Sequence, residues 1–339
     1  MAFRLSLFFV PLLGKMNIIV IMKTKLIAVV ISFIAFPFIM QAQEKVVPFK
    51  YGNMDQWVTR KIHESGIIGG DTKLLYELGP TKVIEGNEAY VNQGGSPWAN
   101  SNVMAKVVGI VKTNTSVYPE RRGDGYCARL ETHIESVKVL GLVNITVLAS
   151  GSIFLGDMKE PITGTKDGEK ALNSGVKFTS RPKAVRYDYK VQMSGEPNRI
   201  KQTGFSRKSI VPGQDCAIMT CLLQKRTEDA DGNIIAKRVG TAVVRYSQTE
   251  DWKDKATYEI RYGDITRDAT YDSELMKLGV GGYYARNSKG ESVLIQENGW
   301  ADPDEAPTHL ILQFTSSLGG AFVGSPGNKF WIDNVCLVY

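Results

Sequence analysis

The sequence lacks the motifs that most catalytic and metal-binding sites require. It contains three histidines, His63, His133 and His309, and none of them stands in an HExxH or other paired spacing. There is no GxSxG, Walker or GxGxxG motif, so the sequence does not indicate a serine-hydrolase nucleophile elbow, a phosphate-binding loop or a dinucleotide-binding fold. None of the four cysteines forms a CxxC pair, so a structural zinc site is not indicated.

The four cysteines are interpreted as buried thiols rather than as bridges. Cys216 and Cys221 are five residues apart in a predicted strand, so their side chains point to opposite faces and cannot pair with each other. Cys127 and Cys336 complete the set. Small apolar thiols in a core are the favoured reading, although export would permit disulfides.

The N-terminus has the composition of a targeting segment. Met22–Lys25 is basic, residues 26–38 carry no charge, and the following residues reach a small side chain at Ala42. This order predicts a secretory signal peptide cleaved after Ala42. The apolar run is too short for a membrane span, which needs roughly 20 residues. Residues 1–21 are interpreted as an upstream extension, with Met16 and Met22 as alternative starts. The expected location is the periplasm or cell surface, with no membrane span after cleavage.

The formal net charge of +6 overstates the basicity of the exported chain. Arg4, Lys15, Lys23 and Lys25 all lie in the segment to be removed, and that segment contains no acidic residue. The net charge of the residues that remain after cleavage gives no indication of a nucleic-acid partner. Residues 43–339 are long enough to enclose one large core.

Period-two alternation dominates the chain after residue 100. In residues 185–193 and 256–262, apolar or aromatic side chains alternate with polar ones, as in strands with one buried face. Only Tyr271–Leu278 could form two helical turns, and strands do not alternate with long helices. The prediction is therefore an all-β, antiparallel β-sandwich.

A hairpin is predicted where two apolar runs flank a turn dipeptide. Ala217–Leu223 and Val239–Tyr246 lie on either side of Asp231-Gly232. By contrast, residues 156–175 are rich in Gly, Lys, Thr and Glu and are interpreted as a long loop, the kind of segment that often carries function.

The last strand changes face. Phe330 and Ile332 share one parity, whereas Val335 and Leu337 share the other. Such a switch predicts a bulge or a change of sheet near Asp333. A chain that ends on a strand residue also predicts that its last segment is held inside the sheet.

A loop around Trp98 has the composition of a sugar site. Residues 92–100 combine an indole with several amides. Sugar faces stack on flat rings, while sugar hydroxyls need amide, carboxylate or guanidinium partners. Trp300 is a second loop candidate. The alternative for both rings is that they pack loops onto the ends of the sandwich.

A glycosidase needs two carboxylates across a cleft. Asp302 and Asp304 alternate but flank a proline, as in a loop, and Glu131 and Glu135 lie at a predicted strand end. The sequence thus contains no convincing pair within one strand, and a pair assembled from distant strands is left open.

Several segments, in their order along the chain, resemble one family. They are Tyr51–Trp57, Pro97–Asn100, Ala149–Gly156, Phe178–Pro182, Tyr187–Tyr189, Thr315–Ser317, Gly320–Phe322, Gly324 and Trp331–Tyr339. Together they resemble the putative carbohydrate metabolism domain family of Bacteroidetes over nearly all of the exported chain. The resemblance implies a jelly-roll β-sandwich over residues 43–339, with a pocket where similar domains hold sugar, and no complete further domain before it.

The first hypothesis is an exported carbohydrate-recognition protein that takes part in the binding or metabolism of an oligo- or polysaccharide. Trp98 would be the stacking platform, with Asn100 and Arg181 as polar partners. Weaker candidates are Trp57, Ser316 and Ser317. For Arg181 the alternative is that it braces a loop before Pro182.

Two other functions are carried as alternatives. One is a glycoside hydrolase or lyase that uses a carboxylate pair in the sandwich pocket, so the question of catalysis stays open, with non-catalytic binding preferred. The other is a structural or adhesion subunit with no sugar ligand, which an exposed, unpaired edge strand would favour.

No organic cofactor is expected, and a structural calcium ion is the one metal considered. In jelly-roll modules of the kind that the resemblance implies, calcium ties the first segment to the last strand. Asn53, Asp55 and Asp333 are the oxygen-bearing side chains at the matching places, although the family more often has Asp and Glu at the first two. The alternative is that Asp333 faces water or accepts backbone N–H bonds at the bulge.

Overall fold

The computed structural model describes residues 44–339 except 108, 140–142, 165–167, 205–206, 319 and 321. Lys45–Tyr339 forms one compact unit. The signal peptide and upstream extension predicted for residues 1–42 lie outside the described residues. The described part contains only two short 3-10 helices, η1 (Gly66–Ile68) and η2 (Glu169–Ala171), besides its strands. No described helix has the length and apolar character needed to cross a membrane.

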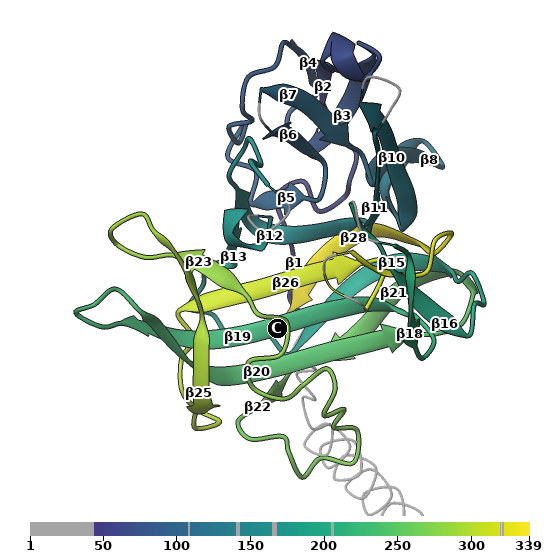
Figure 1. Cartoon of the computed structure of the whole chain (residues 1–339). Coiled ribbons are helices and arrows are strands. Elements are labelled where there is room, and N and C mark those ends of the chain that lie inside the picture. The colour runs from purple at the N-terminus through teal and green to yellow at the C-terminus, as the bar shows by residue number, and fades with distance from the viewer. Residues whose placement is uncertain are drawn as a thin grey trace, which may run out of the picture. The chain divides into compact units, whose positions relative to one another are not determined.

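Two sheets form the sandwich (Figure 1). The first sheet has the order β21-β15-β28-β9-β8, and β1 pairs with β28. Its strands are β1 (Val46–Pro48), β8 (Val117–Arg122), β9 (Gly125–Glu131), β15 (Ala184–Gln192), β21 (Glu250–Glu259) and β28 (Lys329–Val338). All of its pairs are antiparallel.

The second sheet has the order β13-β12-β26-β19-β20-β22, with β5, β14 and β25 attached. Its strands are β5 (Trp98–Asn100), β12 (Ser152–Met158), β13 (Leu172–Ser174), β14 (Val176–Lys177), β19 (Ala217–Glu228), β20 (Ile234–Tyr246), β22 (Arg261–Tyr262), β25 (Gln296–Trp300) and β26 (His309–Thr315). Apart from the parallel pair β20–β25, its pairs are antiparallel. The all-β, antiparallel sandwich predicted from the sequence is confirmed.

Smaller sheets accompany the sandwich. They are β2 (Trp57–His63) with β3 (Thr72–Leu78) and β4 (Lys82–Glu85); β6 (Val103–Val107) with β7 (Ile110–Asn114); β10 (His133–Val139) with β11 (Val143–Ala149) and β17 (Thr203–Gly204); β16 (Asn198–Lys201) with β18 (Ser209–Pro212) and β27 (Val323–Gly324); and β23 (Tyr284–Arg286) with β24 (Ser292–Leu294). The strands β2, β3, β6 and β7 share a small core of Ile62, Leu75, Met104 and Val111. This small core belongs to the same compact unit as the sandwich.

The main core lies between the two sheets, where the alternating residues of β15 meet those of β26. Val185, Tyr187 and Val191 are fully buried. The ring of Tyr187 packs edge-on against Phe314, with 4.9 Å between centroids. Each large side chain buried in this way stabilises the fold by roughly 1.5–3 kcal/mol. The polar residues between them point to the outer face of the first sheet.

The predicted change of face in β28 is a β-bulge. Asp188 pairs with Asp333 but Arg186 pairs with Cys336, so β28 has one residue more than β15 between the two pairs. Asn334 accommodates the extra residue with a φ of 52°, a left-handed conformation that Asn tolerates better than most residues. Residues on both sides of the bulge therefore face the core, while Asp333 lies on the outer face.

Three further predictions are confirmed. β28 pairs with β15, β9 and β1, with Val46 opposite Val338, so the last segment is held inside the sheet. β19 and β20 form the predicted hairpin, whose turn contains Gly232 at a φ of 90°. All four cysteines are free and buried.

One reading of the sequence was wrong. Residues 156–175 are not a loop throughout, because the end of β12 pairs with β13 from Gly156 to Met158. Tyr271–Leu278, the one segment that could have formed two helical turns, forms turns without a helix; the amides of Leu275 and Met276 both donate to the carbonyl of Asp272. A helix of two turns is marginal without strong packing.

Candidate functional site

Trp98, the predicted stacking platform, lies inside the sandwich core. Its side chain is 2% exposed, and its indole Nε1 donates to the carbonyl of Lys50 at 2.9 Å. Its ring packs edge-on against Phe49. Trp300, the second indole considered, lies in β25 with its ring 5.6 Å from the buried guanidinium of Arg238. Both contacts are packing contacts, and the role of Trp98 in sugar binding stays a prediction.

Asn100 and Trp57 are also buried. The side-chain amide of Asn100 donates to the carbonyl of Tyr76 and to Oε2 of Glu77, and its oxygen accepts from the amide of Asn102. The indole of Trp57 donates to the carbonyl of Met54 at 2.6 Å. Asn100 therefore joins β5 to β3.

Ser316 and Ser317 follow β26 and hold a buried polar network. The hydroxyl of Ser317 donates to both carboxylate oxygens of Asp215, at 3.0 and 2.8 Å. Asp215 also accepts from the amides of Leu318 and Ser325. Ser316 bonds with the hydroxyl of Thr132 and with the amide of Gly151. These contacts hold the loop after β26 against the sandwich.

Arg181 braces a loop, the alternative considered from the sequence. Its guanidinium donates to the carbonyls of Pro303 and Glu305 and stacks on the ring of Tyr262 at 4.1 Å. The predicted site residues thus fall into separate places. Trp98 and Asn100 both line one small cavity, and Ser316 and Ser317 are consecutive residues at another place.

The three predicted calcium ligands have protein partners. Asn53 donates to Asp55 at 2.7 Å, and Asp55 accepts from the amide of Tyr126 at 2.9 Å. Asp333 is paired with Arg122, with 2.7 Å between Oδ2 and Nη1. Across the described ranges, no group of three or more His, Cys, Asp and Glu side chains could hold a metal ion. A calcium ion stays a prediction of the sequence; in the structure the carboxylate of Asp333 is compensated by Arg122.

We expect excess calcium and a chelator to give the same melting temperature for the exported chain. Arg122 compensates Asp333, so a cation there would have to displace a guanidinium from its carboxylate. Calorimetric melting in 5–10 mM calcium, which a site of millimolar affinity would register, and then in chelator checks this. A rise in melting temperature with calcium that the double variant Asn53→Ala, Asp55→Ala abolishes would contradict it.

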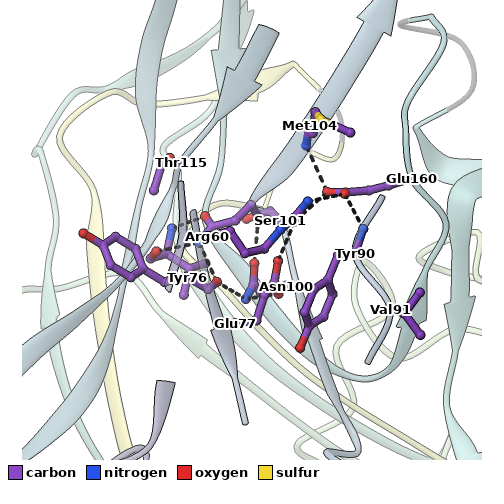
Figure 2. Close-up of polar contacts among 12 residues, drawn as sticks. Arg60, Tyr76, Glu77, Tyr90, Val91, Asn100, Ser101, Met104, Thr115 and Glu160 are labelled. Carbon is purple, nitrogen blue, oxygen red and sulfur yellow. Dashed lines mark hydrogen bonds and ion pairs between the residues drawn. The ribbon is translucent and has the colours of Figure 1, made fainter. Parts of the chain in front are cut away.

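The small cavity adjoins a buried ion-pair network, shown in Figure 2. Arg60 of β2 lies between two glutamates: its Nη1 donates to Glu77 at 3.2 Å and to Glu160 at 3.0 Å. Its Nη2 donates to the other oxygen of Glu160 at 2.6 Å. Glu160 also accepts from the amides of Tyr90 and Met104. The network fastens β3, β6 and the loop before β5 to one another.

Two carboxyl groups share one guanidinium in this network. Burial raises the pKa of Glu77 to about 8, because Arg60 offsets the loss of solvent only in part and Glu160 adds to the rise. The cavity measures about 30 Å³, whereas one water molecule needs roughly 10–15 Å³. A sugar ring does not fit, so the cavity is not a ligand site in this conformation.

A larger, open hollow lies on the outer face of the first sheet. It has a volume of about 520 Å³, within the range typical of ligand sites. Its lining comes from the β8–β9 turn and from β15, β21 and β28. The lining residues are Arg122, Gly123, Asp188, Asp254, Lys255, Asp333 and Asn334.

Two carboxylates meet at the floor of the open hollow. Asp188 and Asp333 stand opposite each other on neighbouring strands. Nη1 of Arg122 donates to Oδ2 of both, at 2.8 and 2.7 Å. Asp188 also accepts from the amide of Lys255 at 2.7 Å and from the side chain of Asn334 at 2.8 Å.

The two carboxyl groups differ in their pKa values. Burial raises the pKa of Asp333 to about 6, since Arg122 and the amide of Asn334 offset it only in part. Burial acts on Asp188 as well, but its hydrogen bonds from Lys255, Asn334 and Arg122 outweigh it and lower the pKa. Paired carboxyls with opposite shifts are typical of acid–base sites.

An aromatic ring and strained backbone accompany these carboxylates. The guanidinium of Arg122 stacks on Trp252 of β21 at 3.9 Å, and its Nη2 contacts Asp254 at 2.5 Å. Lys255 has a φ of 53° and Asn334 one of 52°. These are two of the five non-glycine residues with positive φ in the described part of the chain. Such strain gathers at functional sites.

Sequence reasoning missed most of this hollow. It placed Asp188 on the wet face of its strand and Asp333 at a bulge, but it could not show that the two are opposite each other. No motif or pattern in the sequence pointed to Arg122 or Trp252 as site residues. The only available signal was one acidic residue in each of two predicted strands.

The family model described as "Putative carbohydrate metabolism domain" matches residues 81–338. The chain belongs to this family. Membership gives the chain a general carbohydrate-related role. Every lining residue of the open hollow lies inside the matched range, whereas Arg60 and Glu77 precede it.

One solved structure that the chain matches is a putative glycoside hydrolase from Bacteroides thetaiotaomicron VPI-5482. The two are 17% identical, with a TM-score of 0.39 over 67% of this chain. The match spans 58% of that protein. No curated protein matches the chain.

Proposed function

We propose that this chain is an exported carbohydrate-recognition protein that binds a glycan in the open hollow. The observation that carries this is the hollow itself: about 520 Å³ of open space lined by carboxylate, amide and guanidinium groups, within the residues that match the family. These planar groups are the partners that sugar hydroxyls need. Trp252 is not among the lining residues, but its ring stacks on the guanidinium of Arg122, which is.

The charges of the open hollow favour a neutral glycan. Three carboxylates, on Asp188, Asp254 and Asp333, face two cations, on Arg122 and Lys255. Arg122 already donates to all three carboxylates, so it has little capacity left for an acidic ligand. The carboxylates retain free lone pairs that can accept from hydroxyl groups.

We expect the protein to bind neutral oligosaccharides on a glycan array and to bind the C6-oxidised uronic acid form of the same sugar about tenfold more weakly. A like charge near these carboxylates costs on the order of 1–4 kcal/mol, and 1.4 kcal/mol is tenfold in Kd. Isothermal titration of each pair measures the ratio. No binding to any neutral oligosaccharide would contradict the proposal.

Asp254 offers a matched test of the charge effect. Its side chain is 69% exposed, so Asp254→Asn should leave the fold intact and reduce the discrimination against uronic acids. Asp251→Asn is the control, because Asp251 lies on the same strand, is 87% exposed and is not among the lining residues. Equal effects of the two substitutions would mean that the sugar binds elsewhere.

Export is the second part of the proposal. The basic, apolar and small residues in sequence from Met22 to Ala42 support it. Expression of the full chain, followed by cell fractionation and N-terminal sequencing, tests it. A product in the cytoplasm that keeps residues 22–42 would overturn export without affecting the glycan site.

A further inference from the structure

Two β-bulges meet beside Asp188, at the floor of the open hollow. The bulge of β28 at Asn334 lies on one side of β15. On the other side, β21 places two residues, Asp254 and Lys255, opposite the single residue Asp188. Bulges next to functional sites re-aim side chains. Both neighbours of β15 are therefore distorted at the same point of the sheet.

The carboxylate of Asp188 holds both bulges. Its Oδ1 accepts from the backbone amide of Lys255 at 2.7 Å, and its Oδ2 accepts from Nδ2 of Asn334 at 2.8 Å. Nη1 of Arg122 also donates to Oδ2. These three bonds use most of the acceptor capacity of a carboxylate that is only 6% exposed. Asp188 is therefore committed to the shape of the hollow.

Lys255 has a strained backbone in this bulge. Its φ of 53° is a conformation that glycine adopts without strain and that lysine adopts rarely. The bond from its amide to Asp188 holds it there. Strain of this kind persists where the surrounding structure imposes it, and it gathers at positions that hold a ligand. The strained residue is also one of those that line the hollow.

The side chain of Lys255 is exposed and keeps its donors free. Among the residues that the structure describes, no carboxylate forms an ion pair with its ammonium, although Asp254 and Asp333 line the same hollow and pair with Arg122. An ammonium has three donors, and a hydroxyl group can accept one of them while it donates to a carboxylate. The hollow therefore offers one hydroxyl both a donor and an acceptor.

We propose that Lys255 is the specificity-determining residue of the open hollow: its ammonium binds a hydroxyl group of a neutral glycan, and Asp188 is the positioning residue that presents it through the bulge of β21. This inference rests on the proposed function, because it requires a glycan in the hollow. Asp254 and Asp333 accept from hydroxyl groups, whereas Asp188 acts through Lys255.

The first test compares two exposed lysines of β21. The exported chain is titrated with cellotetraose, maltotetraose, mannotetraose and xylotetraose, and with any other neutral oligosaccharide that the glycan array identifies. Lys255→Met should weaken binding by about 10- to 100-fold, because it removes a charge-assisted hydrogen bond. Lys253→Met is the matched control and should bind as wild type does, since Lys253 is exposed on the same strand but is not among the lining residues.

Lys255→Gly separates strain from contact. Glycine relieves the positive φ and removes the side chain, so this variant should melt close to or above the wild-type temperature. It should nevertheless bind the same sugar as weakly as Lys255→Met does. A lower melting temperature together with wild-type binding would show that Lys255 serves the fold and not the ligand.

Chemical protection reports the contact without a substitution. The exported chain is acetylated with sulfosuccinimidyl acetate, with and without the oligosaccharide that binds, and each lysine is followed by mass spectrometry. The sugar should slow the acetylation of Lys255 and leave that of Lys253 unchanged.

A double-mutant cycle tests the positioning role of Asp188. Asp188→Asn should weaken binding at a temperature where the variant is still folded, and adding Lys255→Met should weaken it no further. A residue that only supports the fold would lower the melting temperature and leave the Kd of the folded protein unchanged. Additive losses of affinity would overturn the role of Asp188.

Equal binding by Lys255→Met and wild type would overturn the inference, and so would equal acetylation of Lys255 with and without the sugar. In either case wild type still binds a neutral oligosaccharide, so the proposed function stands. If wild type binds none of the oligosaccharides, the proposed function and the inference both fail.

Discussion

Replacing Arg60 by Met is expected to lower the free energy of unfolding by about 3–5 kcal/mol at neutral pH. The substitution leaves Glu77 and Glu160 buried without their shared cation, and breaking one side of a buried ion pair has a cost of this size. Met keeps most of the apolar volume of the side chain, so the loss of stability comes from the missing charge and not from a cavity. Urea denaturation of wild type and variant measures it.

The loss should grow as the pH rises. In wild type the pKa of Glu77 is already raised to about 8, so its folded form binds a proton more tightly than its unfolded form. A carboxyl group whose pKa is raised on folding stabilises the folded state fully below its unfolded pKa of about 4.5. This stabilisation is lost as the pH rises through its folded pKa. Without Arg60 that pKa rises further, so the deficit at pH 8 should exceed the deficit at pH 5.

Lys61→Met is the matched control. Lys61 is the next residue of β2, and its pair with Glu85 is exposed, with side-chain exposures of 43% and 66%. Exposed pairs contribute about 0–1 kcal/mol. If the two substitutions change stability equally, the buried network around Arg60 does not hold the sheets together as described.

Much of the fold could be predicted from the sequence because it follows from patterns within single strands and turns. Alternation with period two identified β15 and β21, and the turn dipeptide Asp231-Gly232 identified the β19–β20 hairpin. The parity switch located the bulge at Asn334 to within one residue. Each of these follows from side-chain direction along a single strand.

The candidate site could not be predicted in the same way, because it depends on register between strands. Asp188 and Asp333 are 145 positions apart in the chain, and only the pairing of β15 with β28 brings them together. Arg122 joins them from a hairpin whose length the sequence did not specify. A loop rich in amides around Trp98 was the more visible signal, yet the amide of Asn100 joins β5 to β3 and that of Asn92 bonds within the loop.

Trp98→Ala is expected to destabilise the protein by about 3–5 kcal/mol, the usual loss for a buried Trp replaced by Ala. The sequence alone predicts loss of sugar binding in a protein that stays folded. The burial of the ring at 2% exposure, its packing on Phe49 and its hydrogen bond to Lys50 predict a structural effect instead. Thermal melting and glycan titration of the same sample distinguish the two expectations.

Trp252→Ala supplies the opposite case. Trp252 is only partly buried and its main contact is the stacked guanidinium of Arg122, worth roughly 0.5–1 kcal/mol at an exposed site. This variant should melt close to wild type but bind neutral oligosaccharides less tightly, because Arg122 loses its support beside the two carboxylates. If Trp98→Ala stays folded and loses binding while Trp252→Ala retains it, the sugar lies at the loop around Trp98 and the open hollow is not the glycan site.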